Sequence, residues 1–190
     1  NYTYCFNDTL AAKDIGPGNV LMDEYLKKTK GLDYDKNGDI ASSGNINKDI
    51  INQFYEHEFY NVQQKHSFDR NEFDFSFVKG LEFEDAVATL TYFTALIISK
   101  NIKKIFENNI KIILCGGGRK NLDLIKKIKR NLSNYMQLEL IGNYKIDGDF
   151  IESQAFAFFA IRSHLKLPIS FPNTTGCNKA VSYTHLTLPT

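Results

Sequence analysis

The sequence predicts an α/β fold in which strands pair in parallel. The main observation is a strand–turn–helix–strand succession between residues 110 and 141. Residues 110–115 form a short, continuous apolar run, which predicts a buried strand, and three glycines follow it directly. A helical pattern and a second apolar run, residues 138–141, come next. Two strands joined through a helix pair in parallel, so this order is typical of an α/β sheet.

Composition and charge limit the function classes. The 190 residues suffice for one substantial domain or one lobe of a larger protein. A formal net charge of +1 gives no global field that would attract nucleic acid or an anionic membrane, so we expect neither as a partner. No apolar run approaches the length of a membrane span. The cysteines, Cys5, Cys115 and Cys177, match no disulfide framework or metal spacing, which favours a cytoplasmic protein.

Before the glycine turn, the chain predicts a hairpin and then several helices. Residues 2–6 and 10–13 alternate as strands of the hairpin, and a helix follows from Val20 to about Lys28. Residues 31–40 read as a polar loop, residues 47–60 as a helix, and residues 61–80 as an ordered loop whose Phe73, Phe75, Phe77 and Val78 need burial. The longest helix starts near Glu82, and its predicted buried stripe is Val87, Leu90, Thr94, Ile97, Ile98, Ile102 and Ile105.

After the glycine turn, two more helices are expected. The first carries Leu122, Ile125, Ile128 and Leu132 on one side, and its basic residues 126–130 read as a solvated face. The second covers residues 147–164, and the chain is expected to be extended from Leu167 onward.

A carboxylate followed by a Gly-Pro-Gly turn is the first candidate site. Asp14 is separated by Ile15 from Gly16-Pro17-Gly18, and Asn19 precedes the helix. The glycines allow positive φ or close approach to a ligand, and the proline stiffens the bend. A carboxylate fixed there is placed to act as a base or to cap the helix. From spacing alone capping is favoured, because Asp is a preferred N-cap residue.

The polar loop imitates a calcium-binding EF-hand loop. Its Asp, Asn and Gly residues fill positions 1, 3, 5, 6 and 7 of that motif, but the twelfth position, which should supply a bidentate Glu, is Gly44. A turn rich in Asp, Asn and Gly is therefore the better interpretation. The residues in question are Asp33, Asp35, Asn37, Gly38 and Asp39.

Two further segments, the glycine turn and a later helix start, could either bind a ligand or have only a structural role. Bare backbone at Gly116-Gly117-Gly118, with Asn121 near the following helix start, suits a nucleotide phosphate as well as it suits a simple tight turn. Asp149 and Glu152 have capping-box spacing with Asp149 as the cap, although Glu152 at a helix N-terminus could also face sugar hydroxyls. No His/Cys/Asp/Glu pattern identifies metal ligands.

Several motifs together resemble one family, the anhydro-N-acetylmuramic acid kinases. Residues 14–23 are similar to that family's D-T-G-P-G-N-x-L-x-D segment, with Ile15 in place of the usual Thr. Further similar segments follow in the family's order along residues 1–181. They are residues 65–70, residues 84–91, residues 115–118 with Asn121, residues 147–152 with 154–157, and residues 167–172 with 174–176.

The resemblance implies a fold, a reaction and a site. The fold would be an RNase-H-like lobe of the actin and sugar-kinase type, a mixed sheet flanked by helices, in one part of a two-lobe kinase. ATP with Mg²⁺ would phosphorylate 1,6-anhydro-N-acetylmuramic acid while water opens its anhydro ring, in peptidoglycan recycling. By the same resemblance Asp14 would be the catalytic base, and Glu152 and Asn19 would bind the sugar. The nucleotide would lie on Gly16, Gly18, Gly116, Gly117, Gly118 and Asn121, and the full-length protein would be a homodimer.

Departures from the family pattern set the remaining expectations. The N-terminal lobe of the family, with its G-T-S-x-D-G phosphate loop, has no counterpart, so we expect the chain alone to be inactive. Residues 1–181 are expected to be the C-terminal nucleotide- and sugar-binding part, and residues 182–190 a non-native tail. A kinase for another sugar and a non-catalytic nucleotide-binding lobe are the competing hypotheses.

Overall fold

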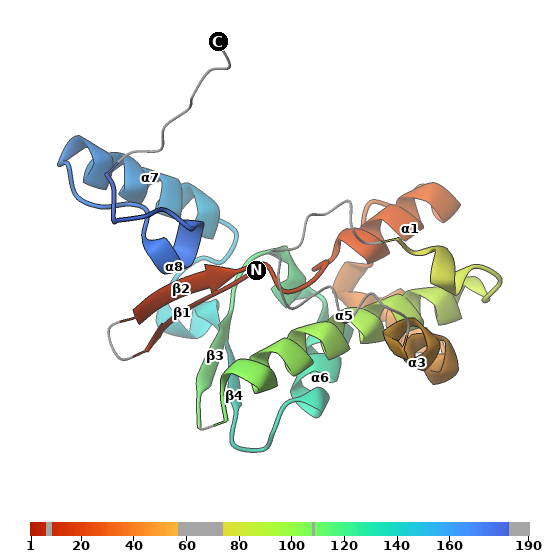
Figure 1. Ribbon diagram of the computed structural model, residues 1–190. Helices are drawn as coiled ribbons and strands as arrows, with labels where there is room; N and C mark the ends of the chain where they lie inside the picture. The colour runs from red at the N-terminus through yellow and green to blue at the C-terminus, as the bar shows by residue number, and fades with distance from the viewer. Residues whose placement is uncertain (7–8, 57–73, 108, 183–190) are drawn as a thin grey trace, which may run out of the picture. The chain divides into compact units, whose positions relative to one another are not determined.

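The structure is a computed structural model that describes residues 1–6, 9–56, 74–107 and 109–182 (Figure 1). It is a mixed α/β structure with helices and small sheets, as the sequence predicts at that level. The chain divides into two compact units. Unit 1 combines Asn1–Asp14 with Asp149–Thr190, and unit 2 is Ile15–Gly148. No described helix combines the length and the apolar character that crossing a membrane requires.

Unit 1 begins with the predicted hairpin. Strands β1 (Tyr2–Phe6) and β2 (Thr9–Lys13) pair antiparallel, with Tyr2 opposite Lys13. Helix α7 (Ile151–His164) confirms the expected helix, although it begins four residues later than residue 147. The segment expected to be extended contains a short helix, α8 (Pro172–Thr175), and an antiparallel bridge between Ser170 and Val181. Helix α8 lies against β2.

Unit 2 contains the predicted parallel pair. Strands β3 (Lys111–Leu114) and β4 (Gln137–Leu140) pair in parallel, and α6 (Leu122–Asn131) connects them through the glycine turn (Figure 1). The described strands form two separate two-stranded sheets and not the single mixed sheet of the expectation. The expected burial of β3 is wrong, since Ile113 is 43% exposed. Within the described residues β3 has β4 as its only partner strand, so alternate side chains stay in contact with solvent.

The core of unit 2 surrounds one long helix, α5 (Phe83–Ile105), which packs against α6 and α2. The predicted stripe on α5 is confirmed except at Ile98, which is partly buried, and at Ile105, which is exposed because the helix ends there. Phe93 is 1% exposed and contacts the Phe77 ring, with 5.1 Å between the ring centroids. The buried apolar residues on α1 and α5 are Leu21, Met22, Tyr25, Leu26, Ala86, Val87, Ala88, Leu90, Phe93, Ala95, Ile97 and Ile102.

The predicted face of α6 is confirmed at Ile128 and Leu132, which are buried, and Ile125 is partly buried. The prediction is wrong at Leu122, the first residue of the helix, which is 61% exposed, and the buried face also includes Leu124. The predicted solvated basic face is wrong at Lys127, which is buried and forms an ion pair with Asp123 one turn earlier. The alkyl stem of a lysine packs well on apolar neighbours while its amine is paired, which explains how a basic residue enters this interface.

The remaining elements of unit 2 are short. Helix α1 (Val20–Lys30) ends at Gly31, whose positive φ of 69° lets its N–H reach the Leu26 and Lys27 carbonyls. The expected loop at 31–40 contains a 3-10 turn, η1 (Lys36–Gly38), and the start of helix α2 (Asp39–Ser43). Helix α3 (Lys48–Glu56) confirms the described part of the helix expected at 47–60.

The described part of the chain contains three further 3-10 turns. They are η3 (Ser76–Val78), η4 (Gly117–Lys120) and η5 (Ile141–Tyr144). Val78 is buried, and Phe75 and Phe77 pack against the core, as the sequence predicts. The expectation for Phe73 and the similar segment at residues 65–70 lie outside the described residues.

Candidate functional site

Asp14 follows β2 directly and does not cap the helix after it. The N-cap of α1 is Asn19, and its side chain makes no capping hydrogen bond. The capping interpretation of Asp14 is therefore wrong, because the four residues of the turn separate it from the helix start. The Asp14 side chain is 47% exposed, and one of its oxygens lies 3.9 Å from the chain's amino terminus. The Asp14 carboxylate is thus accessible to solvent and does not cap the N-terminus of α1.

The turn after Asp14 is fastened to α5 within unit 2. The Ile15 side chain is buried, and its carbonyl accepts a hydrogen bond from Asn101 Nδ2 at 3.3 Å. A Cβ at Gly16 would lie 2.9 Å from Ile97 Cγ2, so only glycine allows this close approach. Gly18 has a positive φ of 58°. Gly16 and Gly18, which are predicted to bind the nucleotide, therefore also have a structural reason to be glycine.

The glycine turn leaves β3 with its backbone uncovered. Gly116 has φ 76° and ψ −177°, a conformation that favours glycine. A Cβ added at Gly116 or Gly117 would have no described atom within 4 Å. Arg119 stabilises the turn, since its Nη1 donates to the Gly116 carbonyl at 2.8 Å and its Nη2 lies 4.0 Å from the Asp147 carboxylate. Arg119 is a positioning residue that the sequence analysis missed.

The structure brings Asn19 to this turn. A Cβ built on Gly118 would lie 3.5 Å from Asn19 Oδ1. That oxygen is buried and has no hydrogen-bond partner among the described residues, which leaves an acceptor for a ligand donor. Asn121 differs, because its Oδ1 accepts from the Leu124 N–H at 2.9 Å and caps α6. Bare backbone and a helix N-terminus together fit the phosphates of a nucleotide, and the unused acceptor beside them fits a donor on a second ligand.

Glu152 lies in the first turn of α7 and is exposed. The predicted capping box is wrong, because Phe150 and not Asp149 occupies the N-cap position and no side chain makes the capping hydrogen bond. The Glu152 carboxylate is therefore not committed to the helix end. Glu152 and Asp14 belong to unit 1, whereas Asn19 and the glycine turn belong to unit 2.

The loop that imitates an EF-hand is a capped turn, as expected. Asp35 is 5% exposed, and its two carboxylate oxygens accept from the backbone N–H groups of Ile40 and Ala41 at 3.0 and 2.9 Å. Asp33, which would be the first calcium ligand, forms an ion pair with Lys27 instead. Among the described residues, no group of His, Cys, Asp or Glu could hold a metal ion.

Asp23 is a candidate that the sequence could not reveal. Partial burial and, after it, the nearby Asp35 carboxylate raise the pKa of Asp23 from 3.8 to about 6. The two residues are brought together by the return of the chain after α1, and no spacing rule on one sequence predicts that contact. A carboxyl group that titrates near neutral pH within one helical turn of Asn19 is a functional-site candidate.

We expect Asp23→Asn to stabilise this chain at about pH 7.5 and to have no effect near pH 4. The folded state holds the Asp23 proton more tightly than the unfolded state, so the free energy of unfolding falls as the pH rises from about 4 to about 6. Asn at this position cannot ionise, so the free energy of unfolding of the variant does not fall in this way as the pH rises. Because the side chain is only half-buried, the difference should stay below about 1 kcal/mol.

Urea unfolding curves across this pH range measure the effect. Glu24→Gln is the matched control, since Glu24 is the next residue on α1 and is exposed. A gain for Asp23→Asn that is the same at both ends of the range would contradict the assignment.

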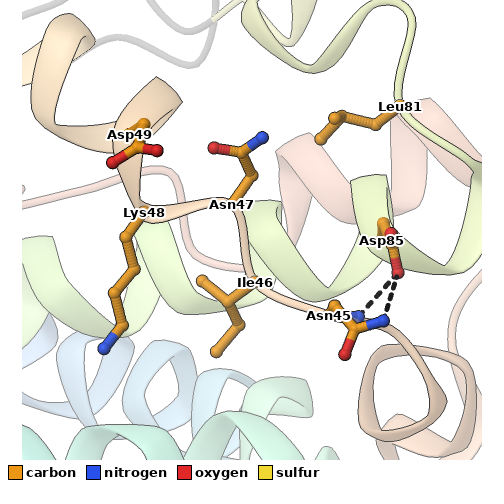
Figure 2. Close-up of a pocket in the computed structure, with 7 residues that line it drawn as sticks. All are labelled: Asn45, Ile46, Asn47, Lys48, Asp49, Leu81 and Asp85. Atoms are coloured by element: carbon orange, nitrogen blue, oxygen red, sulfur yellow. Dashed lines mark hydrogen bonds between the residues drawn. The ribbon is translucent and has the colours of Figure 1, made fainter.

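A shallow pocket of about 370 Å³ in unit 2 contains none of the predicted site residues (Figure 2). Part of its polar lining is already engaged, because one oxygen of Asp85 accepts from Asn45 N at 2.6 Å and from Asn45 Nδ2 at 3.4 Å. These bonds fasten the segment before α3 to the first turn of α5. The pocket therefore reflects a structural junction, and its lining is Asn45, Ile46, Asn47, Lys48, Asp49, Leu81 and Asp85.

Comparison with known proteins decides the family. The model of the family "Anhydro-N-acetylmuramic acid kinase" matches residues 5–188. The chain belongs to this kinase family. The match continues into the segment 182–190, of which the structure describes residue 182 alone, so the non-native tail stays a prediction.

Three bacterial relatives carry the same family name. The chain is 50% identical over 179 residues to the anhydro-N-acetylmuramic acid kinase of Pelagibacter ubique, an alignment that covers 91% of this chain and 48% of the relative. The Zymomonas mobilis relative is 38% identical, with 90% and 46% covered, and the Paramagnetospirillum magneticum relative is 35% identical, with 93% and 50% covered. The chain thus spans about half the length of the curated relatives it matches.

Proposed function

We propose that a complete kinase containing this chain phosphorylates 1,6-anhydro-N-acetylmuramic acid at O6 while water opens the anhydro ring. The product is N-acetylmuramic acid 6-phosphate, for use in peptidoglycan recycling in the cytoplasm. Membership of the family supports the substrate class. The observation that carries the chemistry is Asp14, an accessible carboxylate that the fold does not use to cap α1.

Asp14 acts as the general base. It takes a proton from the water that attacks the anomeric carbon C1, and the bond between C1 and O6 breaks. The electron pair of that bond goes to O6, which accepts the γ-phosphoryl group of ATP, so the water oxygen becomes the C1 hydroxyl. A positioned carboxylate contributes about 10²–10⁴-fold to such a step. The fastening of Ile15 and Gly16 to α5 keeps the turn after Asp14 rigid.

The nucleotide side is built from the two glycine turns. Gly116, Gly117 and Gly118 offer bare backbone, with Gly16 and Gly18 in the turn before α1. Asn121 holds the start of α6, so its part is to position the turn. Mg²⁺ bound to ATP neutralises charge on the phosphates during transfer.

The sugar side contains Glu152 and Asn19. The exposed Glu152 carboxylate accepts hydrogen bonds from sugar hydroxyls, and the unused Asn19 Oδ1 is available to a donor on the sugar beside the glycine turn. Two RNase-H-like lobes enclose both ligands in the complete kinase, and the chain supplies one part of that enclosure. Its metal ligands are unassigned.

An isotope experiment tests the reaction. The protein is a chimera, called here the complete kinase, in which the part of the Pelagibacter ubique relative that precedes the matched residues is joined to Asn1 of this chain. With the anhydro sugar, Mg-ATP and ¹⁸O-water, we expect one ¹⁸O at C1 of a 6-phosphate product, measured by mass spectrometry and ³¹P and ¹³C NMR. Product without label at C1 would exclude attack of water at that carbon.

Two controls separate the competing hypotheses. A complete kinase that phosphorylates simple hexoses and leaves the anhydro sugar untouched would identify a kinase for another sugar. This chain alone, without the preceding half, should turn over neither ATP nor sugar, because it has no second phosphate-binding loop. Turnover by the chain alone would overturn that part of the proposal.

A further inference from the structure

The loop that imitates an EF-hand lies against the glycine turn. Its 3-10 turn η1 packs on η4 and on α6, and all three belong to unit 2. The closest approach is at Gly38, which is buried and has a positive φ of 78°. A Cβ built on Gly38 would lie 2.3 Å from Asn121 Oδ1. The backbone of the loop can therefore touch Asn121 only because residue 38 is glycine.

The first turn of α6 is also close to Gly38. The same built Cβ would lie 2.8 Å from Asp123 Cβ and 3.0 Å from Asp123 N. Because Asp123 N is a backbone atom, no side-chain rotation could move it away. The Asp123 side chain is itself held by its ion pair with Lys127, whose side chain is only 9% exposed. The loop thus meets the N-terminal end of α6 with no side chain of residue 38 between them.

The core holds the loop on its other side. Asp35 is buried, and its two carboxylate oxygens accept from the backbone N–H groups of Ile40 and Ala41, which fixes the path of the chain on both sides of Gly38. Ala41 lies on α2, is 1% exposed, and belongs to the core around α5. Helix α2 packs on α5. A loop that is fastened to the longest helix of the core is a firm support for the residue it touches.

Asn121 connects this support to the glycine turn. The residue is buried, and its Oδ1 accepts from the Leu124 N–H at 2.9 Å. Its own N–H donates to the Gly118 carbonyl at 3.1 Å. Asn121 thus joins the end of the glycine turn to the first turn of α6, so a displacement of this one residue disturbs both.

We propose that Gly38 is a positioning residue that sets the place of the glycine turn, Gly116–Gly118, through Asn121. A side chain at position 38 would push Asn121 away from the loop, and Gly118 would move with it. The consequence for nucleotide binding rests on the proposed function, whereas the effect of Gly38 on the turn does not. An EF-hand needs its sixth-position glycine for a sharp turn, but here the glycine at that position gives room to Asn121.

Amide exchange in the chain alone tests this support without any ligand. In Gly38→Ala we expect the Asn121 and Leu124 amides to exchange at least about 10-fold faster than in the parent, relative to the Leu90 amide in the core helix α5. NMR measures the exchange residue by residue. Referring the rates to Leu90 removes any acceleration that comes from a general loss of stability.

Gly31→Ala is the matched control for the exchange experiment. Gly31 has a similar φ of 69°, and a Cβ there would meet no described atom within 4 Å. The control therefore has the same cost of a left-handed backbone but creates no close contact. Its exchange at Asn121 and Leu124 should change by less than about threefold. Equal acceleration in Gly31→Ala and Gly38→Ala would overturn the proposal.

Steady-state kinetics of the complete kinase give a second readout. Gly38→Ala should raise the KM for ATP by at least about 10-fold and change the KM for the sugar by less than about threefold. Gly31→Ala should leave both KM values within about threefold of the parent. A merely structural role would lower the amount of folded enzyme, and with it kcat, without raising one KM selectively. Equal rises of both KM values in Gly38→Ala would contradict positioning of the nucleotide side.

A second variant tests the route through Asn121 and does not depend on the folding of Gly38→Ala. Asn121→Ser keeps a preferred N-cap residue for α6, but its shorter side chain loses the contact with Gly38. We expect the KM for ATP to rise by at least about threefold while the thermal midpoint falls by less than about 2 °C. An unchanged KM for ATP would show that Asn121 only caps α6 and would overturn the proposal.

Combining the two substitutions isolates the contact. In the Asn121→Ser background, the rise in KM for ATP caused by Gly38→Ala should be at least about threefold smaller than in the parent. The same rise in both backgrounds would assign the effect to Asp123 and overturn the part of Asn121. A complete kinase that does not use ATP, together with the expected exchange pattern in the chain alone, would reject the proposed function and leave the positioning of the turn intact.

Discussion

Asp14→Asn in the complete kinase should abolish nearly all turnover while leaving both ligands bound. The amide has the size of the carboxylate but cannot take a proton from the attacking water. We expect kcat to fall by about 10³-fold or more, and the KM values for sugar and ATP to change by less than about threefold. Steady-state kinetics measure the turnover, and calorimetric titration of each ligand measures the binding.

The control variant and a rescue experiment distinguish a base from a structural residue. Asp49→Asn removes an exposed carboxylate from α3 and should leave kcat unchanged. In Asp14→Ala, added formate should restore part of the lost turnover, since a small carboxylate can occupy the space and take the proton. Retained turnover in Asp14→Asn would remove Asp14 as the base. Lost binding of the sugar would instead assign Asp14 a role in holding the substrate.

The local elements of this fold could be predicted because their signals are local. The hairpin, α1, α5 and the parallel β3–α6–β4 unit all follow from the period of apolar residues and from glycine positions. The burial of β3 could not be predicted in the same way, because a short apolar run does not say how many strands flank it. Ile113 stays exposed beside a single partner strand among the described residues.

Capping was predicted less well than element type. Asp14 and Asp149 both have the residue type and spacing of a cap, yet Asn19 and Phe150 occupy the N-cap positions. A shift of one to five residues at a helix start depends on the turn before it, which spacing does not encode. In each case the acidic residue that was expected to cap the helix, Asp14 or Asp149, does not occupy the N-cap position.

The contacts that define the candidate site are long-range. The approach of Asn19 to Gly118 and that of Asp23 to Asp35 both depend on how α1 packs, and neither pair has a sequence pattern. The roles of the site residues were therefore predicted from the resemblance to a kinase family. The family match confirms that the chain belongs to that family. Their roles in catalysis stay predictions.

Gly44→Ala should unfold unit 2 or come close to it. A Cβ on Gly44 would lie 2.1 Å from the Glu84 carbonyl oxygen, 2.3 Å from its carbon and 2.7 Å from Asp85 N. These are backbone atoms in the first turn of α5, so no side-chain rotation can relieve the contact. Gly44 has ordinary backbone angles, with φ −92°, so the whole effect comes from this lack of space.

The segment after Gly44 shows why the chain cannot simply move away. Asn45 N donates to Asp85 at 2.6 Å, and Asn47 N donates to Thr89 Oγ1 at 3.0 Å, so the backbone follows the first two turns of α5. Moving residue 44 outward breaks these bonds and separates α2 from α5. Overpacking of about 1–3 kcal/mol combines here with lost hydrogen bonds, and we expect a total loss above about 3 kcal/mol.

Urea unfolding followed by circular dichroism measures this loss, with Gly142→Ala as the matched control. A Cβ at Gly142 meets no described atom within 4 Å, so that variant should stay within about 0.5 kcal/mol of the parent. A loss below about 1 kcal/mol for Gly44→Ala would contradict the close packing of α2 on α5. The same glycine stands where a calcium loop would need a bidentate Glu. The packing therefore excludes any side chain at the position whose carboxylate an EF-hand requires.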